Sequence, residues 1–338
     1  GLLGMGPAMS LRGSRHNATT PGIAPPRSET SLRIAWVGPT PTQGGGAAGC
    51  AWDVVTGLSA LGCEIDCYLG GEHDQIPREL WDLAGVRVVN FDTGWRYDHW
   101  YSNHAITKVV TGLGASAWSR RRLASLLAEQ HRIRPYDVLY QFSTIELFGL
   151  HDRLDALAPL VVHPSTHAAG ELHGMRTERY LAARCEPWWR RWAVESLLVT
   201  RARKQRRDIQ TAQRVVAISR RFGEHLVADY GVDPARITVV PNPIDLEALR
   251  PTTRTTSHVR HIVFVGRVSV RKGVDLIVEL SHRLADLEGE VVLDVVGTQT
   301  LWSDYRPLLA DLHPGVARVH GYLHRPELIR LLAAADLL

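Results

Sequence analysis

Short apolar runs alternate with amphipathic segments along most of this chain, and no other feature constrains the fold as strongly. The runs over residues 32–38, 64–69, 86–91, 136–142 and 160–163 have the length and composition of buried parallel strands. The segments 48–61 and 115–131 carry apolar residues at helical spacing. This alternation predicts a doubly wound α/β sheet, in which ligands bind at the carboxyl ends of the strands.

The pattern starts again after a long helical stretch over residues 186–216. A strand near Val215, a helix from Arg220 and a stop at Gly231 are followed by strands at 237–240, 290–297 and 316–321. We therefore expect two Rossmann-like domains, 32–214 and 215–338, facing each other across a cleft. The segment 1–31 is rich in Gly, Pro, Ser and Thr and is expected to be disordered. Because residue 338 falls inside an apparent element, we also expect the second domain to be incomplete.

Composition narrows the function classes. With 45% hydrophobic residues the chain can bury a large core, and a formal charge of +4 is too mild to indicate a nucleic-acid-binding protein. The four cysteines show no C-x-x-C spacing, which fits a reducing cytoplasm. No apolar run approaches the roughly 20 residues that span a bilayer.

Residues 261–276, HIVFVGRVSVRKGVDL, combine a strand with two cations and a helix start. Gly266 ends the strand, Arg267 and Lys272 follow, and Gly273 opens the helix. Backbone N–H groups and the helix dipole favour an anion at such a position, and the two side chains would neutralise a phosphate or diphosphate. The alternative is an ordinary loop between strand and helix with solvated charges.

The first strand is followed by a glycine-rich loop, residues 39–49, PTPTQGGGAAG. Gly44, Gly46 and Gly49 match G-x-G-x-x-G, and Asp66 lies where a ribose-binding acid of a dinucleotide site could stand. The match is poor because a Pro-rich insert separates these glycines from the strand end. The other interpretations are a flexible loop that lets a ligand approach the backbone and a plain connection.

Polar side chains follow the strand at 160–163, in the sequence HPSTHAAGE. His163, His167 and Glu171 stand at the carboxyl end of a strand, where a neutral imidazole can hydrogen-bond a hydroxyl group or a developing charge. A structural histidine is the alternative.

Two aromatic segments could contact a partner. Residues 95–101, WRYDHWY, include Trp95 and Tyr97 and could contact an acceptor, although such clusters more often pack a loop onto its domain. Residues 188–207 place three tryptophans among arginines, a pattern that could dock on an anionic membrane surface or a phosphorylated acceptor. Solvated arginines on a helix whose tryptophans pack inward are the more common arrangement.

Several ordered motifs together resemble the retaining GT-B glycosyltransferases of family 4. They are GGGAAG, VVAISRR, VVPNPID, VFVGRVSVRKGVDL, VVG and VHGYLHRPELIRLLAAADLL, and they cover residues 32–338. The resemblance implies a cytoplasmic transferase that moves a sugar, with retention of configuration, from a UDP-, GDP- or ADP-sugar. The acceptor would be a glycan, as in polysaccharide biosynthesis, a glycolipid or a small molecule. It also implies that the enzyme needs no metal or other cofactor, and peripheral contact with the inner face of a membrane is an open expectation for residues 188–207.

The resemblance also assigns roles to residues. It gives the donor diphosphate to Arg267, Lys272, Gly45 and Gly46, and the active-site histidine to His163, with His167 as the rival. The remaining donor and cleft positions are Gly266, Ser219, Asn242, Gly297, Gly321, Tyr322 and Leu323. We expect Glu171, Trp95 and Tyr97 on the acceptor side.

One departure and three alternatives accompany this interpretation. The E-x7-E segment of the family should follow AAADLL, where these residues stop, so we expect the 338 residues alone to be weakly active or inactive. The alternatives are a nucleotide-sugar epimerase, a catalytically silent nucleotide-binding partner of the same fold, and an NAD(P)-linked oxidoreductase that uses Gly44, Gly46 and Gly49.

Overall fold

The computed structural model describes residues 31–43, 46–70, 76–91, 106–142, 154, 156–165, 167–244, 258–298 and 303–338, without the side chains of 106–117 and 119. Several predictions fall outside these residues. They concern the segment 1–30, Gly44 and Gly45 of the glycine loop, and Trp95 and Tyr97 of the aromatic loop.

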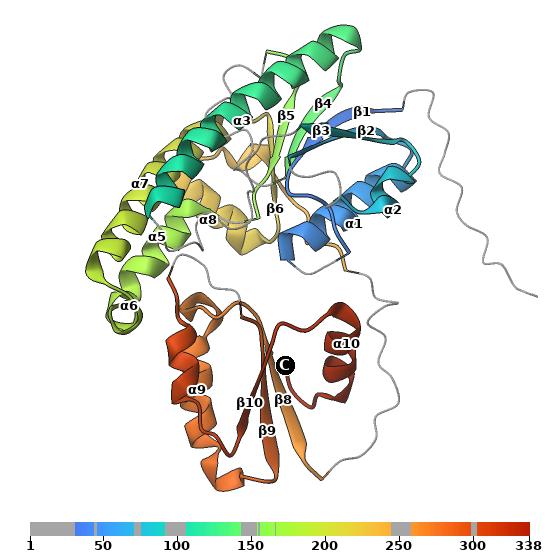
Figure 1. Ribbon diagram of the computed structural model, residues 1–338. Coiled ribbons are helices and arrows are strands. Elements are labelled where there is room, and N and C mark those ends of the chain that lie inside the picture. Colours follow the sequence, from blue (N-terminus) through green and yellow to red (C-terminus); the bar gives the residue numbers. More distant parts are fainter. Residues whose placement is uncertain are drawn as a thin grey trace, which may run out of the picture. The chain divides into compact units, whose positions relative to one another are not determined.

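The first sheet comprises, in the described residues, seven parallel strands in the order β3-β2-β1-β4-β5-β6-β7 (Figure 1). Its strands are β1 (Arg33–Val37), β2 (Glu64–Gly70), β3 (Val86–Phe91), β4 (Val138–Phe142), β5 (Leu160–His163), β6 (Arg214–Ala217) and β7 (Ile237–Val239). The first five were expected within two residues at either end. Their parallel pairing confirms the doubly wound α/β class.

Helices cover both faces of this sheet (Figure 1). They are α1 (Gly46–Ala60), α2 (Arg78–Trp81), α3 (Ile106–Ile133), α5 (Ala168–Thr177), α6 (Arg179–Cys185), α7 (Trp188–Thr211) and α8 (Arg220–Tyr230). Successive side chains of a strand point to opposite faces. Accordingly, Trp36 belongs to a core cluster with Val55 of α1 and Leu80 of α2. Its neighbour Val37 belongs to a separate cluster that includes Leu127 of α3.

The second sheet has three described parallel strands in the order β10-β9-β8. They are β8 (Arg260–Val265), β9 (Val291–Val296) and β10 (Ala317–Gly321). The 3₁₀ turns η3 (Val270–Lys272) and η5 (Arg306–Asp311) and the helices α9 (Val274–Arg283) and α10 (Arg325–Ala334) accompany them. Leu293 and Val295 of β9 form its core with Leu312 and Val316. In the described part of the chain, no helix has both the length and the apolarity needed to cross a bilayer.

The structure corrects the expected position of the second domain. Val162 of β5 pairs with Val215, and Val215 pairs with Ile237, so β6 and β7 extend the first sheet. The change of sheet lies between Val239 and Arg260, not at residue 215. An apolar strand pattern indicates that a strand is buried, but it does not indicate which strand it pairs with. The sequence alone therefore cannot distinguish strands that extend the first sheet from strands that start a second one.

Candidate functional site

The three strands of the second sheet end at a common edge made of glycine. Gly266 follows β8 and its N–H donates to the carbonyl of Val296 (3.0 Å), while the N–H of Gly297, after β9, donates to the carbonyl of Gly321 (2.7 Å). Gly297 has a φ of +130°, and a Cβ atom there would lie 1.9 Å from the carbonyl oxygen of Gly266. Only glycine fits at position 297, so this edge presents bare backbone at the place where α/β sheets bind ligands.

Arg267 and Lys272 lie beside the glycine edge. Arg267 is half-buried and Lys272 is exposed, and a Cβ atom on Gly266 would be 3.7 Å from Cβ of Lys272. Neither charged side chain has a hydrogen bond or an ion pair within the described part of the chain. Helix α9 begins directly after Gly273, which has a φ of +82°. Two uncompensated cations beside a helix N-terminus fit an anionic ligand such as a diphosphate.

Four further residues were predicted on the donor side of the cleft. Tyr322 is exposed and contacts His324 edge-on (5.4 Å), while Leu323 is half-buried. Asn242 is exposed in the segment after β7. Ser219 caps α8, because its Oγ accepts a hydrogen bond from the N–H of Phe222 (3.1 Å). A helix cap therefore accounts for the serine, and the ligand roles of these residues stay predictions.

His163 ends β5 and is almost fully buried (2% exposed). Its Nδ1 atom lies 2.8 Å from the hydroxyl of Tyr140 on β4, and its ring meets the ring of Phe142 edge-on at 4.7 Å. Its Nε2 atom is buried and has no hydrogen-bond partner among the described residues. Burial lowers the pKa of His163 to about 4, so the imidazole is neutral at neutral pH.

We assign the tautomer of His163 from its contact with Tyr140. Burial raises the pKa of the Tyr140 phenol, so the hydroxyl keeps its proton, and Nδ1 of His163 is its one hydrogen-bond partner within the described residues. We infer that Tyr140 donates to Nδ1, which leaves the ring proton on Nε2. A buried donor without an acceptor costs about 1–3 kcal/mol, and a ligand oxygen would satisfy it.

His167 is held differently. It is the residue that precedes α5, and its Nε2 lies 2.8 Å from a carboxylate oxygen of Asp229 on α8. Its ring meets the rings of Phe222 and Tyr230 edge-on, and a Cβ atom on Gly170 would lie 2.5 Å from it. These contacts tie α5 to α8, so His163 remains the first candidate for the active-site histidine.

Two residues that sequence reasoning missed belong near these candidates. Arg271, half-exposed, lies with its Nη1 3.8 Å from Oε1 of Glu171 in the first turn of α5. Its position directly before Lys272 was the available signal. Tyr140 carried no signal of its own, because its contact with His163 depends on the pairing of β4 with β5.

The structure overturns the role considered for Asp66. This residue is the third of β2 and is 6% exposed, whereas a ribose-binding acid belongs at the carboxyl end of a strand. Its carboxylate accepts hydrogen bonds from Arg33 (2.6 Å), Arg87 (2.6 and 2.7 Å) and Tyr136. Gly49, in turn, is buried inside α1. The interpretation of the glycine loop as a dinucleotide-binding turn therefore lacks the ribose-binding acid that it requires.

Among the described residues, no group of His, Cys, Asp and Glu side chains is arranged to hold a metal ion. That the protein needs neither a metal nor another cofactor stays a prediction. All four cysteines are free thiols.

Comparison with known proteins gives a family. The family model described as Glycosyltransferase Family 4 matches residues 44–248, more than half of the chain. A relative from Geodermatophilus obscurus, named D-inositol 3-phosphate glycosyltransferase, is 36% identical over 101 residues, which are 26% of this chain and 22% of that protein. Matches to the curated relatives span between about a fifth and a third of their length.

Solved structures share the fold. HepE of Anabaena, in complex with UDP and glucose, aligns with a TM-score of 0.53 and 15% identity over 90% of this chain and 73% of HepE. WaaG, a glycosyltransferase involved in lipopolysaccharide biosynthesis, aligns with a TM-score of 0.55 and 15% identity over 90% of this chain and 74% of WaaG. These likenesses establish the GT-B fold.

Proposed function

Because the chain belongs to glycosyltransferase family 4, we propose that it transfers a sugar from a nucleotide-sugar donor to an acceptor with retention of anomeric configuration. The observation that carries this proposal is the position of two cations, Arg267 and Lys272, which have no ion pair among the described residues and lie beside the glycine edge and the start of α9. The complex of HepE with UDP and glucose supports a uridine diphosphate sugar as the donor.

In this proposal Arg267 and Lys272 bind the donor diphosphate and stabilise the negative charge that develops on it as the glycosidic bond breaks. The backbone of Gly46, together with Gly45, approaches the same diphosphate. The nucleoside lies along Gly297 and residues 321–323. His163, neutral and with its proton on Nε2, donates a hydrogen bond to an oxygen of the donor sugar.

The acceptor proposal comes from the relatives. The name of the Geodermatophilus protein makes D-inositol 3-phosphate the first acceptor to test, with glycans and glycolipids as the other classes. Glu171, Trp95 and Tyr97 are the proposed acceptor-side residues. A cytoplasmic location is a further proposal, supported by the four free thiols.

A thermal-shift screen tests the proposal, because ligands that bind the native state raise the melting temperature. The chain would be screened against UDP, GDP, ADP, their sugar conjugates and NAD(H). We expect a shift with UDP and UDP-sugars. NMR of the transfer product would then establish its anomeric configuration. A shift with NAD(H) alone would support the oxidoreductase, and epimerised donor without transfer would support the epimerase. Donor binding without any turnover, in the longest available form of the protein, would support the silent partner.

A further inference from the structure

The start of α7 exposes its tryptophans to solvent. Trp188 is 72% exposed, Trp192 is 69% exposed and Trp189 is 39% exposed. The expectation that these rings pack inward is therefore wrong. Clustered large aromatic side chains on a surface mark an interaction site, whereas scattered ones do not.

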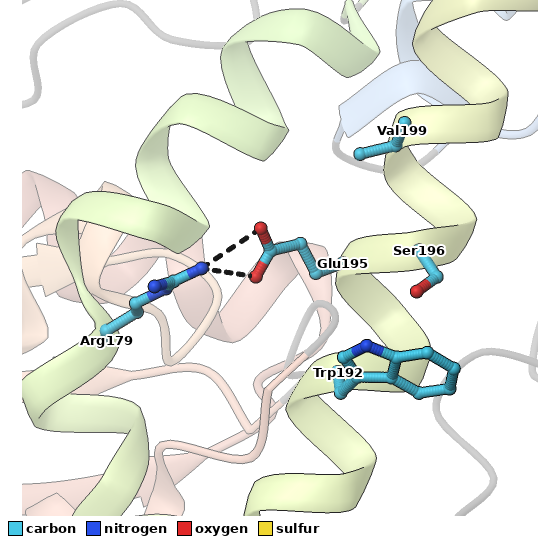
Figure 2. A pocket seen from close by; sticks show the side chains of 5 residues that line it. All are labelled: Arg179, Trp192, Glu195, Ser196 and Val199. Atoms are coloured by element: carbon cyan, nitrogen blue, oxygen red, sulfur yellow. Dashed lines mark hydrogen bonds and ion pairs between the residues drawn. The ribbon is translucent and has the colours of Figure 1, made fainter.

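The tryptophans continue into a basic stripe along the same helix. Residues 192, 196, 199, 203 and 206 recur every three or four positions and so share one face. Figure 2 shows Trp192, Ser196 and Val199 along α7. Arg203 and Arg206 are exposed at the other end of the stripe and have no ion pair within the described residues. We call Trp188, Trp189 and these five residues the α7 face; from 192 to 206 it runs about 21 Å.

Positive charge is concentrated around this face. Residues 176–211 contain ten Lys and Arg and four Asp and Glu, a net charge of +6. The whole chain carries +4, so all other residues together carry −2. The basic character of the protein is thus a property of this one region.

Two adjoining hollows, of about 320 and 250 Å³, lie beside the α7 face. Figure 2 shows the residues that line the larger one. Both are lined by Arg179 of α6, Trp192 and Glu195, and the smaller one also by Arg191. Glu195 accepts hydrogen bonds from both Arg176 and Arg179 (2.8 Å each). Two arginines therefore bind one carboxylate and Arg191 lines the smaller hollow beside them, so the local charge stays positive.

We propose that the α7 face docks on the surface of an anionic phospholipid bilayer. The helix lies in the plane of the interface, where the tryptophan rings enter the boundary between headgroups and acyl chains and the arginines contact lipid phosphates. The charge imbalance selects a polyanionic surface, and each Lys or Arg near such a membrane contributes about 1 kcal/mol. This inference goes beyond the proposed transferase activity and does not depend on the identity of the acceptor.

Vesicle sedimentation tests the proposal with the 338-residue chain. The probes are vesicles of phosphatidylcholine alone and of phosphatidylcholine mixed with anionic phosphatidylglycerol, whose negative surface potential attracts polybasic segments. One variant combines Trp188→Ala with Trp192→Ala, and a second combines Arg203→Glu with Arg206→Glu. Trp118→Ala on α3, which removes a tryptophan that is 53% exposed elsewhere, is the control. Circular dichroism and melting temperature verify that each variant is folded.

We expect binding to the anionic vesicles alone, weakened by high salt, reduced about tenfold or more in both double variants and unchanged in the control. Equal binding to neutral vesicles, or undiminished binding by both folded double variants, would overturn the proposal. The proposal would also fail if the protein does not bind vesicles and instead forms a concentration-dependent dimer in sedimentation velocity, provided that the tryptophan variant does not form this dimer. That result would make the α7 face a contact between two copies of the chain.

Discussion

A Cβ atom on Gly297 would lie 1.9 Å from the carbonyl oxygen of Gly266. The ends of β8 and β9 approach so closely that no side chain fits between them, and the backbone of Gly297 is in the left-handed region as well, with a φ of +130°. The edge that we assign to the donor therefore depends on this one glycine.

Gly297→Ala should destabilise the protein by several kcal/mol, since the strand ends must separate to admit a methyl group. Gly289→Ala is the matched control, because Gly289 also has a positive φ (+86°) but open space around it. Its cost should be about 1–2 kcal/mol, the conformational term alone. Urea unfolding compares the two variants, and equal losses would refute the close approach.

Asp66→Asn should lower the free energy of unfolding by about 3 kcal/mol at pH 7, since it leaves the buried guanidinium of Arg33 without its carboxylate. Burial tends to raise the pKa of Asp66, but hydrogen bonds from Arg87 and Tyr136 and the nearby arginine charges outweigh it and lower the pKa. A lowered carboxyl pKa stabilises the fold above about pH 4 and loses that effect as the pH falls through the folded-state pKa.

The difference between wild type and Asp66→Asn should accordingly shrink below about pH 4. Asp82→Asn, at an exposed carboxylate after α2, serves as the control and should change little. A pH-independent difference would show that the pKa of Asp66 is the same in the folded and the unfolded chain, which would contradict the stabilised carboxylate.

His163 should make stability fall in mildly acidic solution. Its folded-state pKa of about 4 lies below the unfolded value of about 6.5, because burial disfavours the charged ring. Between these two pH values the unfolded chain takes up a proton that the folded chain does not, which costs on the order of 3 kcal/mol in total by pH 4. The unfolding free energy of wild type minus that of His163→Gln should therefore decline across this window.

His173→Gln, at an exposed histidine of α5, is the control for this measurement and should show no such decline. If His163→Gln and wild type respond to pH in parallel, the imidazole is not desolvated in solution.

Tyr140→Phe should change the tautomer of His163 without unfolding the protein. Loss of the hydroxyl removes the donor 2.8 Å from Nδ1, so the proton would no longer be confined to Nε2. Nitrogen-15 NMR of the imidazole distinguishes the two tautomers. We expect Nε2–H in wild type and in Tyr180→Phe, which alters an exposed tyrosine, and a mixture in Tyr140→Phe. An unaltered spectrum in Tyr140→Phe would contradict the hydrogen bond.

Strand positions could be predicted from the sequence because short apolar runs bounded by glycine and polar residues have few other structures available to them. Residues 86–91 and 160–163 were predicted with the observed boundaries. The assignment of β6 and β7 could not be predicted, because a strand pattern carries no information on its neighbour. The three tryptophans of α7 recur at helical spacing, as core residues do, and the pattern alone cannot show that they are exposed among the described residues.

The candidate site was predictable to a similar extent. Arg267 and Lys272 follow a strand end that the sequence shows directly. The contacts of Asp66 with Arg33 and Arg87, and of Tyr140 with His163, each join two paired strands, and they follow only from the strand pairing and its register.

Calorimetric titration with UDP most directly tests the central claim that the edge of the second sheet binds a nucleoside diphosphate. Arg267→Ala and Lys272→Ala should each weaken binding by about 2 kcal/mol or more, as expected for charge-assisted hydrogen bonds to a phosphate. Arg283→Ala removes a cation that is paired with Glu279 at the far end of α9, and it should bind UDP as wild type does. Undiminished affinity in both Arg267→Ala and Lys272→Ala would contradict the account.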